Sequence, residues 1–186
     1  MAILSSISRL RMFRASLILF LAARNIFAGA GQPIDEYQLK AVFLYNFARF
    51  VQWPSEAFQS PNDPIAICIL GENPFGYSLG QAVDGKAIEQ RKFTIRQIAE
   101  PRQAAGCQIL FVSSSEQKHL RGILAEIRTP GTLIVGDSDR FAEEGGVANL
   151  KLEGDHIRIQ VNVAAAERAK LQISSRLLSL AQIVRK

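Results

Sequence analysis

Three short, continuous apolar segments, separated by helical patterns, place the strongest constraint on the fold of this chain. The segments are Ile65–Leu70, Gln108–Ser113 and Leu133–Val135. Strands of this kind are buried on both faces, which requires helices on both sides of their sheet. The intervening helices are expected near Tyr77–Val83 and Glu116–Ile127, and a further strand around Phe93–Ile95. The sequence therefore predicts a single three-layer α/β domain, in which a mixed, partly parallel sheet is flanked by helices.

A different pattern appears near the C-terminus, where apolar and polar residues alternate on both sides of Gly154-Asp155. A two-residue loop between alternating runs predicts a β-hairpin. The register of this hairpin pairs Leu152 with Ile157 and Leu150 with Ile159 on one face of the sheet. The opposite, polar face is expected to be in contact with solvent.

A last helix is expected after the hairpin, with Ser174 or Ser175 as its N-cap. Its predicted core stripe consists of Leu177, Leu178, Ala181 and Val184. Arg158 on the polar face of the hairpin and Arg176 on this helix are candidates for binding an anionic small molecule or the carboxylate of a partner. The alternative is that both arginines belong to an ordinary solvated surface.

Residues 1–30 have the pattern of a secretory signal peptide. Positively charged residues precede the apolar run Ala15–Ala23, and small residues follow it. The run is much shorter than the roughly 20 residues that span a bilayer. We therefore expect cleavage after Ala28 or Ala30 and a periplasmic location for the domain formed by residues 31–186; an uncleaved membrane anchor is the alternative.

The net charge of +5 is due mainly to this leader, which contains four arginines and no acidic residue. Without the leader, 18 basic residues are balanced by 17 acidic residues. The remaining domain lacks the excess of basic charge that binding to phosphates requires. We therefore expect no nucleic acid partner.

The two cysteines of the chain, Cys68 and Cys107, each lie in an apolar segment. In an oxidising compartment, a single pair of cysteines predicts one disulfide. The alternative is two buried free thiols in neighbouring strands. Neither cysteine belongs to a C-x-x-C motif, which argues against a redox activity.

The segment Tyr37–Gln52 predicts a helix that is apolar on nearly every side and ends before Trp53-Pro54. Such a helix needs a second surface to cover it, either on another molecule or within its own domain, and the sequence favours neither. If the helix lies in an interface, the candidate interface residues are its aromatic side chains, Tyr37, Phe43, Tyr45, Phe47 and Phe50.

Motifs typical of catalysis are missing from the sequence. The loop Gly71–Gly76 lacks the lysine of a phosphate-binding loop and is interpreted as a turn between a strand and a helix. Neither the histidines nor the acidic residues have metal-ligand spacing, and no G-x-S-x-G motif occurs. Asp137, at the end of a strand, is interpreted as a turn-capping residue rather than as a functional group. We therefore expect no enzyme activity, no catalytic residues, no metal and no cofactor.

Five segments, taken in order, resemble the sequence signature of the YfiR-like family of periplasmic proteins. The first is the run Tyr37–Pro54, which reads YQLKAVFLYNFARFVQWP. The other four lie within Ile67–Gly76, Cys107–Ser113, Gly136–Gly146 and Val161–Leu178. Together these segments extend over almost the whole domain.

The resemblance implies a signalling regulator that represses a membrane-bound diguanylate cyclase by binding the periplasmic domain of this enzyme. It also implies a homodimer, release of the cyclase through an outer-membrane lipoprotein, and a disulfide between Cys68 and Cys107. Because the family is broad, a periplasmic protein that senses a small molecule and regulates another membrane receptor is the alternative.

Overall fold

The computed structural model of this protein describes residues 35–127 and 130–185. The chain divides into two units, Met1–Pro33 and Ile34–Lys186, and the described residues belong to the second. The predicted signal peptide and its cleavage after Ala28 or Ala30 lie outside the described residues.

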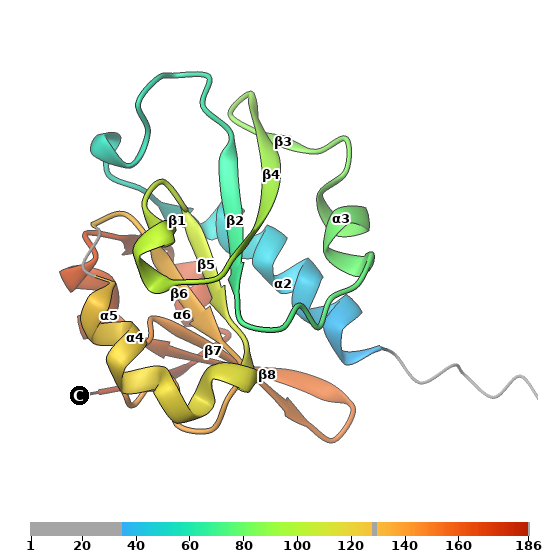
Figure 1. The fold of residues 1–186 in the computed structure, drawn as a ribbon, viewed down its shortest axis with the longest axis vertical. Helices are drawn as coiled ribbons and strands as arrows, with labels where there is room; N and C mark the ends of the chain where they lie inside the picture. Colours follow the sequence, from blue (N-terminus) through green and yellow to red (C-terminus); the bar gives the residue numbers. More distant parts are fainter. Residues whose placement is uncertain (1–34, 128–129, 186) are drawn as a thin grey trace, which may run out of the picture. The chain divides into compact units, whose positions relative to one another are not determined.

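Helices and strands alternate along most of the second unit (Figure 1). The helices are α2 (Glu36–Phe50), α3 (Ser78–Val83), α4 (Leu120–Glu126), α5 (Val163–Arg168) and α6 (Ser175–Leu178), with 3₁₀ helices η1 (Ser55–Ala57), η2 (Pro101–Ala104) and η3 (Ser114–His119). The strands are β1 (Val51–Gln52), β2 (Ile65–Leu70), β3 (Ala87–Ile88), β4 (Arg91–Ile98), β5 (Ile109–Val112), β6 (Leu133–Gly136), β7 (Ala148–Glu153), β8 (His156–Asn162), β9 (Gln172–Ile173) and β10 (Gln182–Val184).

Eight of these strands form one mixed sheet in the order β10-β8-β7-β6-β5-β2-β4-β3. The five consecutive strands β4, β2, β5, β6 and β7 run parallel to one another, whereas β8 pairs antiparallel with β7 and β3 pairs antiparallel with β4. The strands β1 and β9 form a separate two-stranded antiparallel ladder. The predicted mixed, partly parallel sheet is therefore confirmed.

Each face of the large sheet is covered by its own hydrophobic cluster. Along β2, the odd-numbered residues Ile67 and Ile69 pack in the cluster that contains α2 and α3. The even-numbered residues Cys68 and Leu70 pack in the cluster that contains α4. Because neighbouring residues of a strand point to opposite faces, α2 and α4 lie on opposite sides of the sheet, and the three-layer arrangement is confirmed.

The C-terminal hairpin has the predicted register, with Leu152 opposite Ile157 and Leu150 opposite Ile159. Its polar face, however, is only partly in contact with solvent. Asn162 is buried, and its side chain accepts a hydrogen bond from the Ala165 N–H at the start of α5. The prediction of a fully solvated face was wrong at this position, because the Asn162 amide also donates to the Ala142 carbonyl, so that the side chain is enclosed between the loop after β6 and the start of α5.

Two predicted helices end earlier than expected. The N-terminal helix ends at Phe50, and Val51–Gln52 instead form β1, which pairs with β9. The last helix is capped by Ser174, one of the two predicted N-caps, and ends at Leu178. Gln182–Val184 form β10, parallel to β8. Leu177, Leu178 and Ala181 of the predicted core stripe do pack in the cluster that contains α2 and α3, but the placing of Val184 on the same helix was wrong. At both positions, an available neighbouring strand offers backbone hydrogen bonds that compete with those of a helix.

Candidate functional site

The helix α2 is largely covered by its own domain. Phe47 is 0% exposed and lies in the main hydrophobic cluster. Its assignment to a candidate interface was therefore wrong, because a fully buried side chain offers no surface to a partner. Tyr37, Phe43, Tyr45 and Phe50 are partly buried against the same cluster, so they keep some surface that another molecule can contact.

A buried ion pair joins α2 to the carboxyl end of β6. Lys40 Nζ lies 2.8 Å from Asp137 Oδ2, and the two side chains are 2% and 1% exposed, respectively. Lys40 also pairs with Glu36, one helical turn earlier. The interpretation of Asp137 as a simple turn cap was wrong, because its carboxylate binds a lysine located 97 residues earlier in the chain.

Tyr37 completes this polar cluster. Its hydroxyl donates a 2.9 Å hydrogen bond to Asp137 Oδ2, and Lys40 Nζ lies 4.5 Å from the centre of its ring. Partial burial, followed by the neighbouring charge of Asp137, raises the pKa of Tyr37 to about 12. The tyrosine thus stays a neutral donor over the physiological pH range, and the cluster connects the first turn of α2 to the sheet.

The loop after Asp137 is shaped by close packing against a buried ring. Phe141 is fully buried, and a Cβ atom at Gly136 or Gly146 would overlap its ring. Only glycine, which has no side chain, fits at these two positions. The packing of Phe141 therefore explains why glycine occurs at both positions. It also holds in place the backbone that carries Asp137.

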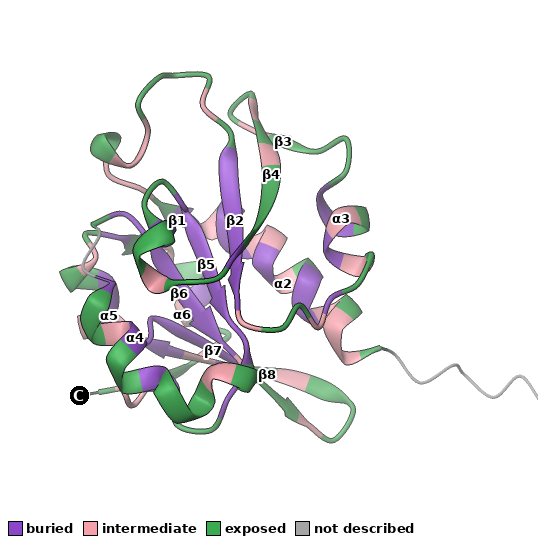
Figure 2. Cartoon of the chain, viewed as in Figure 1, coloured by how far each residue is buried: buried purple, intermediate pink, exposed green. Residues whose placement is uncertain are grey.

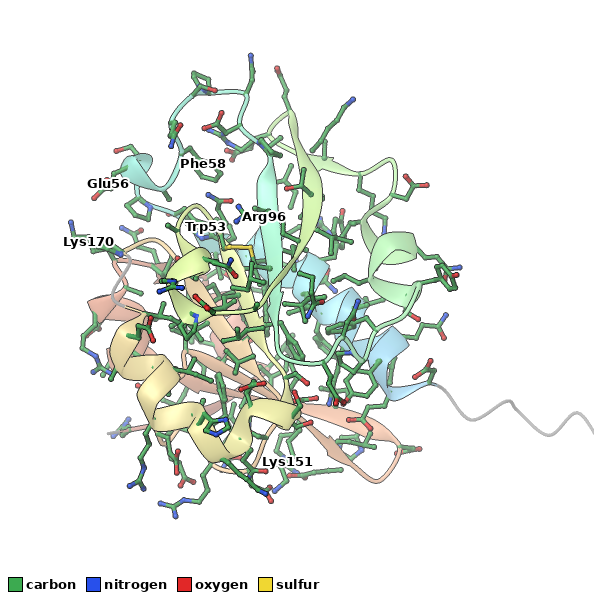
Figure 3. The ribbon with its side chains drawn as sticks, in the orientation of Figure 1. Trp53, Glu56, Phe58, Arg96, Lys151 and Lys170 are labelled. Atoms are coloured by element: carbon green, nitrogen blue, oxygen red, sulfur yellow. A yellow bond between two sulfur atoms is a disulfide. The ribbon has the colours of Figure 1, made fainter. Side chains whose placement is uncertain are left out.

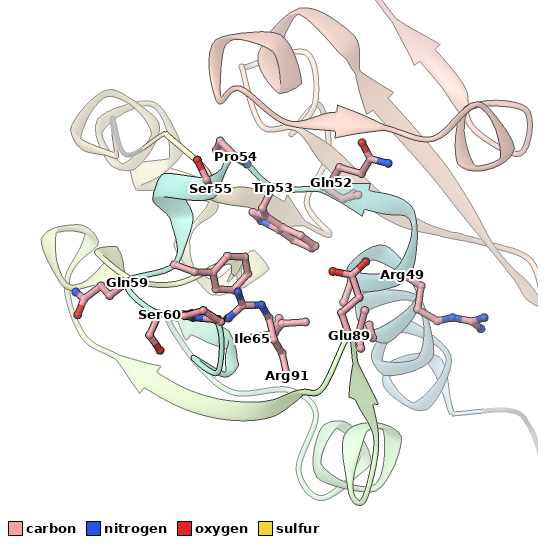
Figure 4. A pocket seen from close by; sticks show the side chains of 15 residues that line it. Arg49, Gln52, Trp53, Pro54, Ser55, Gln59, Ser60, Ile65, Glu89 and Arg91 are labelled. Carbon is pink, nitrogen blue, oxygen red and sulfur yellow. Dashed lines mark hydrogen bonds between the residues drawn. The ribbon is translucent and has the colours of Figure 1, made fainter.

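A pocket of about 560 Å³ lies at the opposite end of α2 (Figure 4). It is lined by the end of α2, β1, the segment from 53 to 61, the start of β2 and the turn between β3 and β4. Figure 4 shows Trp53 and Glu89 pointing toward the middle of the pocket, whereas Arg49 extends away from it.

One wall of this pocket is held in place by Arg91. Its guanidinium lies 3.7 Å from the centre of the Phe58 ring and donates hydrogen bonds to the backbone carbonyls of Ser60 and Asp63. Trp53 Nε1 donates to the Gln108 carbonyl at 3.2 Å. Aromatic surface with a few fixed polar groups is typical of sites for small molecules. The sequence did not reveal this pocket, because it forms only where the turn between β3 and β4 comes close to residues 48–65 in the folded chain.

Arg158 and Arg176 contact different residues. Arg158 Nε donates to Glu153 Oε2 across the hairpin, and the Arg176 guanidinium lies 5.8 Å from the centre of the Phe50 ring. Neither arginine lines the pocket at the end of α2. The role of these residues in ligand or partner binding stays a prediction.

Cys68 in β2 and Cys107, two residues before β5, form a disulfide, which is drawn as a yellow bond in Figure 3. The Cα atoms of Cys68 and Cys107 are 5.9 Å apart, and both residues are buried. The predicted disulfide is therefore found in the structure, and the alternative of two free thiols is not.

Within residues 35–127 and 130–185, no three histidine, cysteine or acidic side chains come together in a way that suits a metal ion. In the same part of the chain, no helix has the length and apolar character needed to cross a bilayer.

Comparison with known families assigns this chain to a regulatory class of protein. Residues 37–182 match the YfiR/HmsC-like family, and the chain belongs to this family. YfiR-like proteins are periplasmic regulators rather than catalysts. No curated protein sequence matches the chain significantly.

Two solved structures are similar to this one. A conserved domain protein from Vibrio cholerae shares 13% identity and a TM-score of 0.53, with 81% of this chain and 60% of that chain covered. This chain thus spans less than two thirds of that protein, and the likeness shows the fold alone. The ABC domain in complex with L-Trp from Streptococcus pneumoniae shares 11% identity and a TM-score of 0.45, covering 64% and 55% of the two chains. This second likeness is too weak to carry an argument.

Proposed function

We propose that this protein is a periplasmic regulator that represses a membrane-bound diguanylate cyclase through direct protein–protein contact. The family match over residues 37–182 is the observation that carries this proposal. The pattern of residues 1–30 and the disulfide support an exported protein, since disulfides persist in oxidising compartments.

The proposed partner is the periplasmic domain of the cyclase, and the protein binds it as a homodimer. An outer-membrane lipoprotein that sequesters the regulator releases the cyclase. The partly exposed aromatic residues of α2, namely Tyr37, Phe43, Tyr45 and Phe50, are the proposed contact surface. The buried Lys40–Asp137 pair and the hydrophobic cluster hold this helix rigid, so little ordering entropy is lost on binding.

The experiment compares cyclic-di-GMP in cells that contain or lack this protein. Deletion is expected to raise the cyclic-di-GMP level, and wild-type protein is expected to restore it. The purified mature chain should bind the isolated periplasmic domain of the cyclase. An unchanged cyclic-di-GMP level in the deletion strain, together with no binding between the purified components, contradicts the proposal.

A second candidate function, sensing of a small molecule, is favoured by the pocket at the end of α2. Trp53 is the single tryptophan of the chain and lines this pocket, so its fluorescence reports directly on occupancy. Titration with free amino acids and nucleotides is expected to change the emission and to raise the melting temperature. A ligand that raises the melting temperature of wild type and of Trp53→Phe equally, without changing the emission of wild type, binds elsewhere and contradicts this candidate.

A further inference from the structure

A groove of about 840 Å³ lies between α3 and β4, on the face of the sheet opposite the one that carries the disulfide. It is lined by residues of α3, the loop from 84 to 87 and the first half of β4. Apolar surface is exposed along it, because Tyr77 is 90% exposed and Ile95 is 40% exposed. Figure 2 shows β4 as a mainly exposed strand beside the buried strand β2.

The backbone of β4 forms an open edge of the sheet. Its outer neighbour β3 pairs only through Ala87 opposite Lys92 and Ile88 opposite Arg91. Among the described residues, no strand covers the outer side of the segment from 93 to 98. Unpaired strand edges present a row of hydrogen-bond donors and acceptors to any extended chain that can reach them.

The pairing of β2 shows which backbone groups of β4 face outward. The carbonyls of Ala66 and Leu70 accept hydrogen bonds from the β5 side, so the even-numbered residues of β2 face β5 and the odd-numbered residues face β4. Ile67 lies opposite Ile95 in the parallel ladder. In a parallel ladder, a residue that faces the partner strand makes its backbone hydrogen bonds to the residues just before and just after the one opposite it. Ile67 therefore bonds Thr94 and Arg96, and the N–H and C=O of Ile95 point away from β2.

The side chains of β4 define what kind of strand fits this edge. Phe93 and Ile95 line the groove, and Thr94 and Arg96 alternate with them along the strand. The strand RKFTIRQI contains three basic residues and no acidic residue. A complementary strand therefore carries apolar residues on the face of Phe93 and Ile95, and acidic residues at the intervening positions.

A second copy of this chain does not satisfy these requirements. Pairing two β4 strands edge to edge would gather Lys92 and Arg96 of both copies without any acidic residue from either strand. Like charges on neighbouring strands are destabilising, and basic residues on an edge are a common protection against self-pairing.

The geometry points to β4 and the groove beside α3 as a docking site for an extended segment of a partner protein, in which apolar and acidic residues alternate. The segment adds a strand to the sheet: its backbone bonds the outward groups of Ile95, its apolar side chains enter the groove and its acidic side chains meet Lys92 and Arg96. The inference rests on the proposed function only in that this protein acts by binding other proteins.

The test uses the mature protein and fluorescein-labelled peptides of eight residues, without the cyclase, so its failure is separate from failure of the proposed function. The probes are a peptide that alternates valine with glutamate, one that alternates valine with lysine, and one with four valines followed by four glutamates. Fluorescence polarisation is expected to show the first binding about tenfold more tightly than the other two.

Two variants examine the edge itself. Ile95→Pro removes an outward N–H, a position at which edge strands tolerate proline, and is expected to weaken the preferred peptide about tenfold. The Lys92→Glu/Arg96→Glu double variant is expected to reverse the preference toward the peptide with lysine. Its matched control, Lys118→Glu/Arg185→Glu, changes the net charge equally at exposed residues outside β4 and is expected to keep the wild-type preference.

Equal binding of all three peptides by wild type overturns the inference, as does a control pair that behaves like the β4 pair. If Ile95→Pro does not fold, the charge-reversal pair decides the question alone. Self-association of wild type that is lost in the folded Ile95→Pro variant also overturns it, since a second copy would then occupy the edge.

Discussion

The ion pair between Lys40 and Asp137 is almost completely buried, and Glu36 is the other acidic residue that pairs with Lys40. Both side chains are at most 2% exposed, and Asp137 Oδ1 has no hydrogen-bond partner among the described residues. A buried pair adds little net stability compared with apolar residues, but loss of one partner leaves an uncompensated charge.

We predict that Asp137→Ala lowers the free energy of unfolding by up to about 3–5 kcal/mol, because Lys40 then stays buried with only the partly exposed Glu36 as a carboxylate partner. Urea denaturation followed by circular dichroism measures this loss. The double variant Lys40→Met/Asp137→Leu is expected to recover much of it, since both charges are removed together. A loss below about 1 kcal/mol in Asp137→Ala would mean that Glu36, together with water, already compensates the charge of the lysine.

Because of Tyr37, the free energy of unfolding is expected to depend on pH in the alkaline range. Its pKa rises from 10.0 to about 12 on folding, mainly because of partial burial and then because of the charge of Asp137. The folded state thus favours the neutral phenol. The resulting stabilisation is complete below pH 10 and is lost as the pH rises toward about 12.

We predict that wild type loses more unfolding free energy between pH 10 and about 12 than Tyr37→Phe does. Short urea unfolding experiments at a series of pH values measure the difference. Parallel pH dependence in the two proteins contradicts the assignment, whatever the absolute stability of the variant.

At the scale of elements, α2 serves chiefly to cover one face of the sheet, although its sequence is apolar on nearly every side. Leu44 and Phe47 are fully buried in the main cluster, whereas Val42 on the same helix is 45% exposed. The additional apolar side chains pack against other elements, as the tilted contact between Tyr45 and Phe93 shows.

We predict that Phe47→Ala lowers the free energy of unfolding by about 3–5 kcal/mol, because it opens a cavity in the core. Val42→Ala, the matched change at an exposed position of α2, is expected to shift it by less than about 0.5 kcal/mol. Thermal and urea unfolding of both variants provide the measurement. If Phe47→Ala leaves stability unchanged but abolishes assembly, the original interface prediction is right and the burial argument fails.

The whole molecule is stabilised by a covalent link on the face of the sheet opposite α2. The disulfide joins residues 39 positions apart and lies in the cluster that contains α4. It therefore restricts the unfolded chain across a central part of the sheet, which is how disulfides contribute most of their stabilisation in the chain-entropy model.

We predict that Cys68→Ala/Cys107→Ala lowers the free energy of unfolding by about 2–4 kcal/mol. Reduction of wild type with dithiothreitol is expected to lower its stability to a similar value and to leave the double variant unchanged. Equal stability of oxidised and reduced wild type would show that the link does not constrain the unfolded state.

Much of the architecture could be predicted from local sequence patterns, because those patterns reflect local physics. Continuous apolar runs predicted the buried strands, strict alternation around Gly154 predicted the hairpin register, and Ser174 marked a helix start. The end of the chain was harder to predict. Gln182–Val184 form a strand only because they pair with β8, and a local propensity takes no account of such a partner.

The sequence by itself determined the α/β class, the hairpin, the cysteine pair and the family, since each depends on residue order or spacing along the chain. Only the tertiary structure decided that Lys40 meets Asp137, that Phe47 is core, and that Trp53 and Arg91 line one pocket. Such contacts join residues far apart in sequence. Their free energy depends on burial and distance, which exist only after the sheet and its helices have come together.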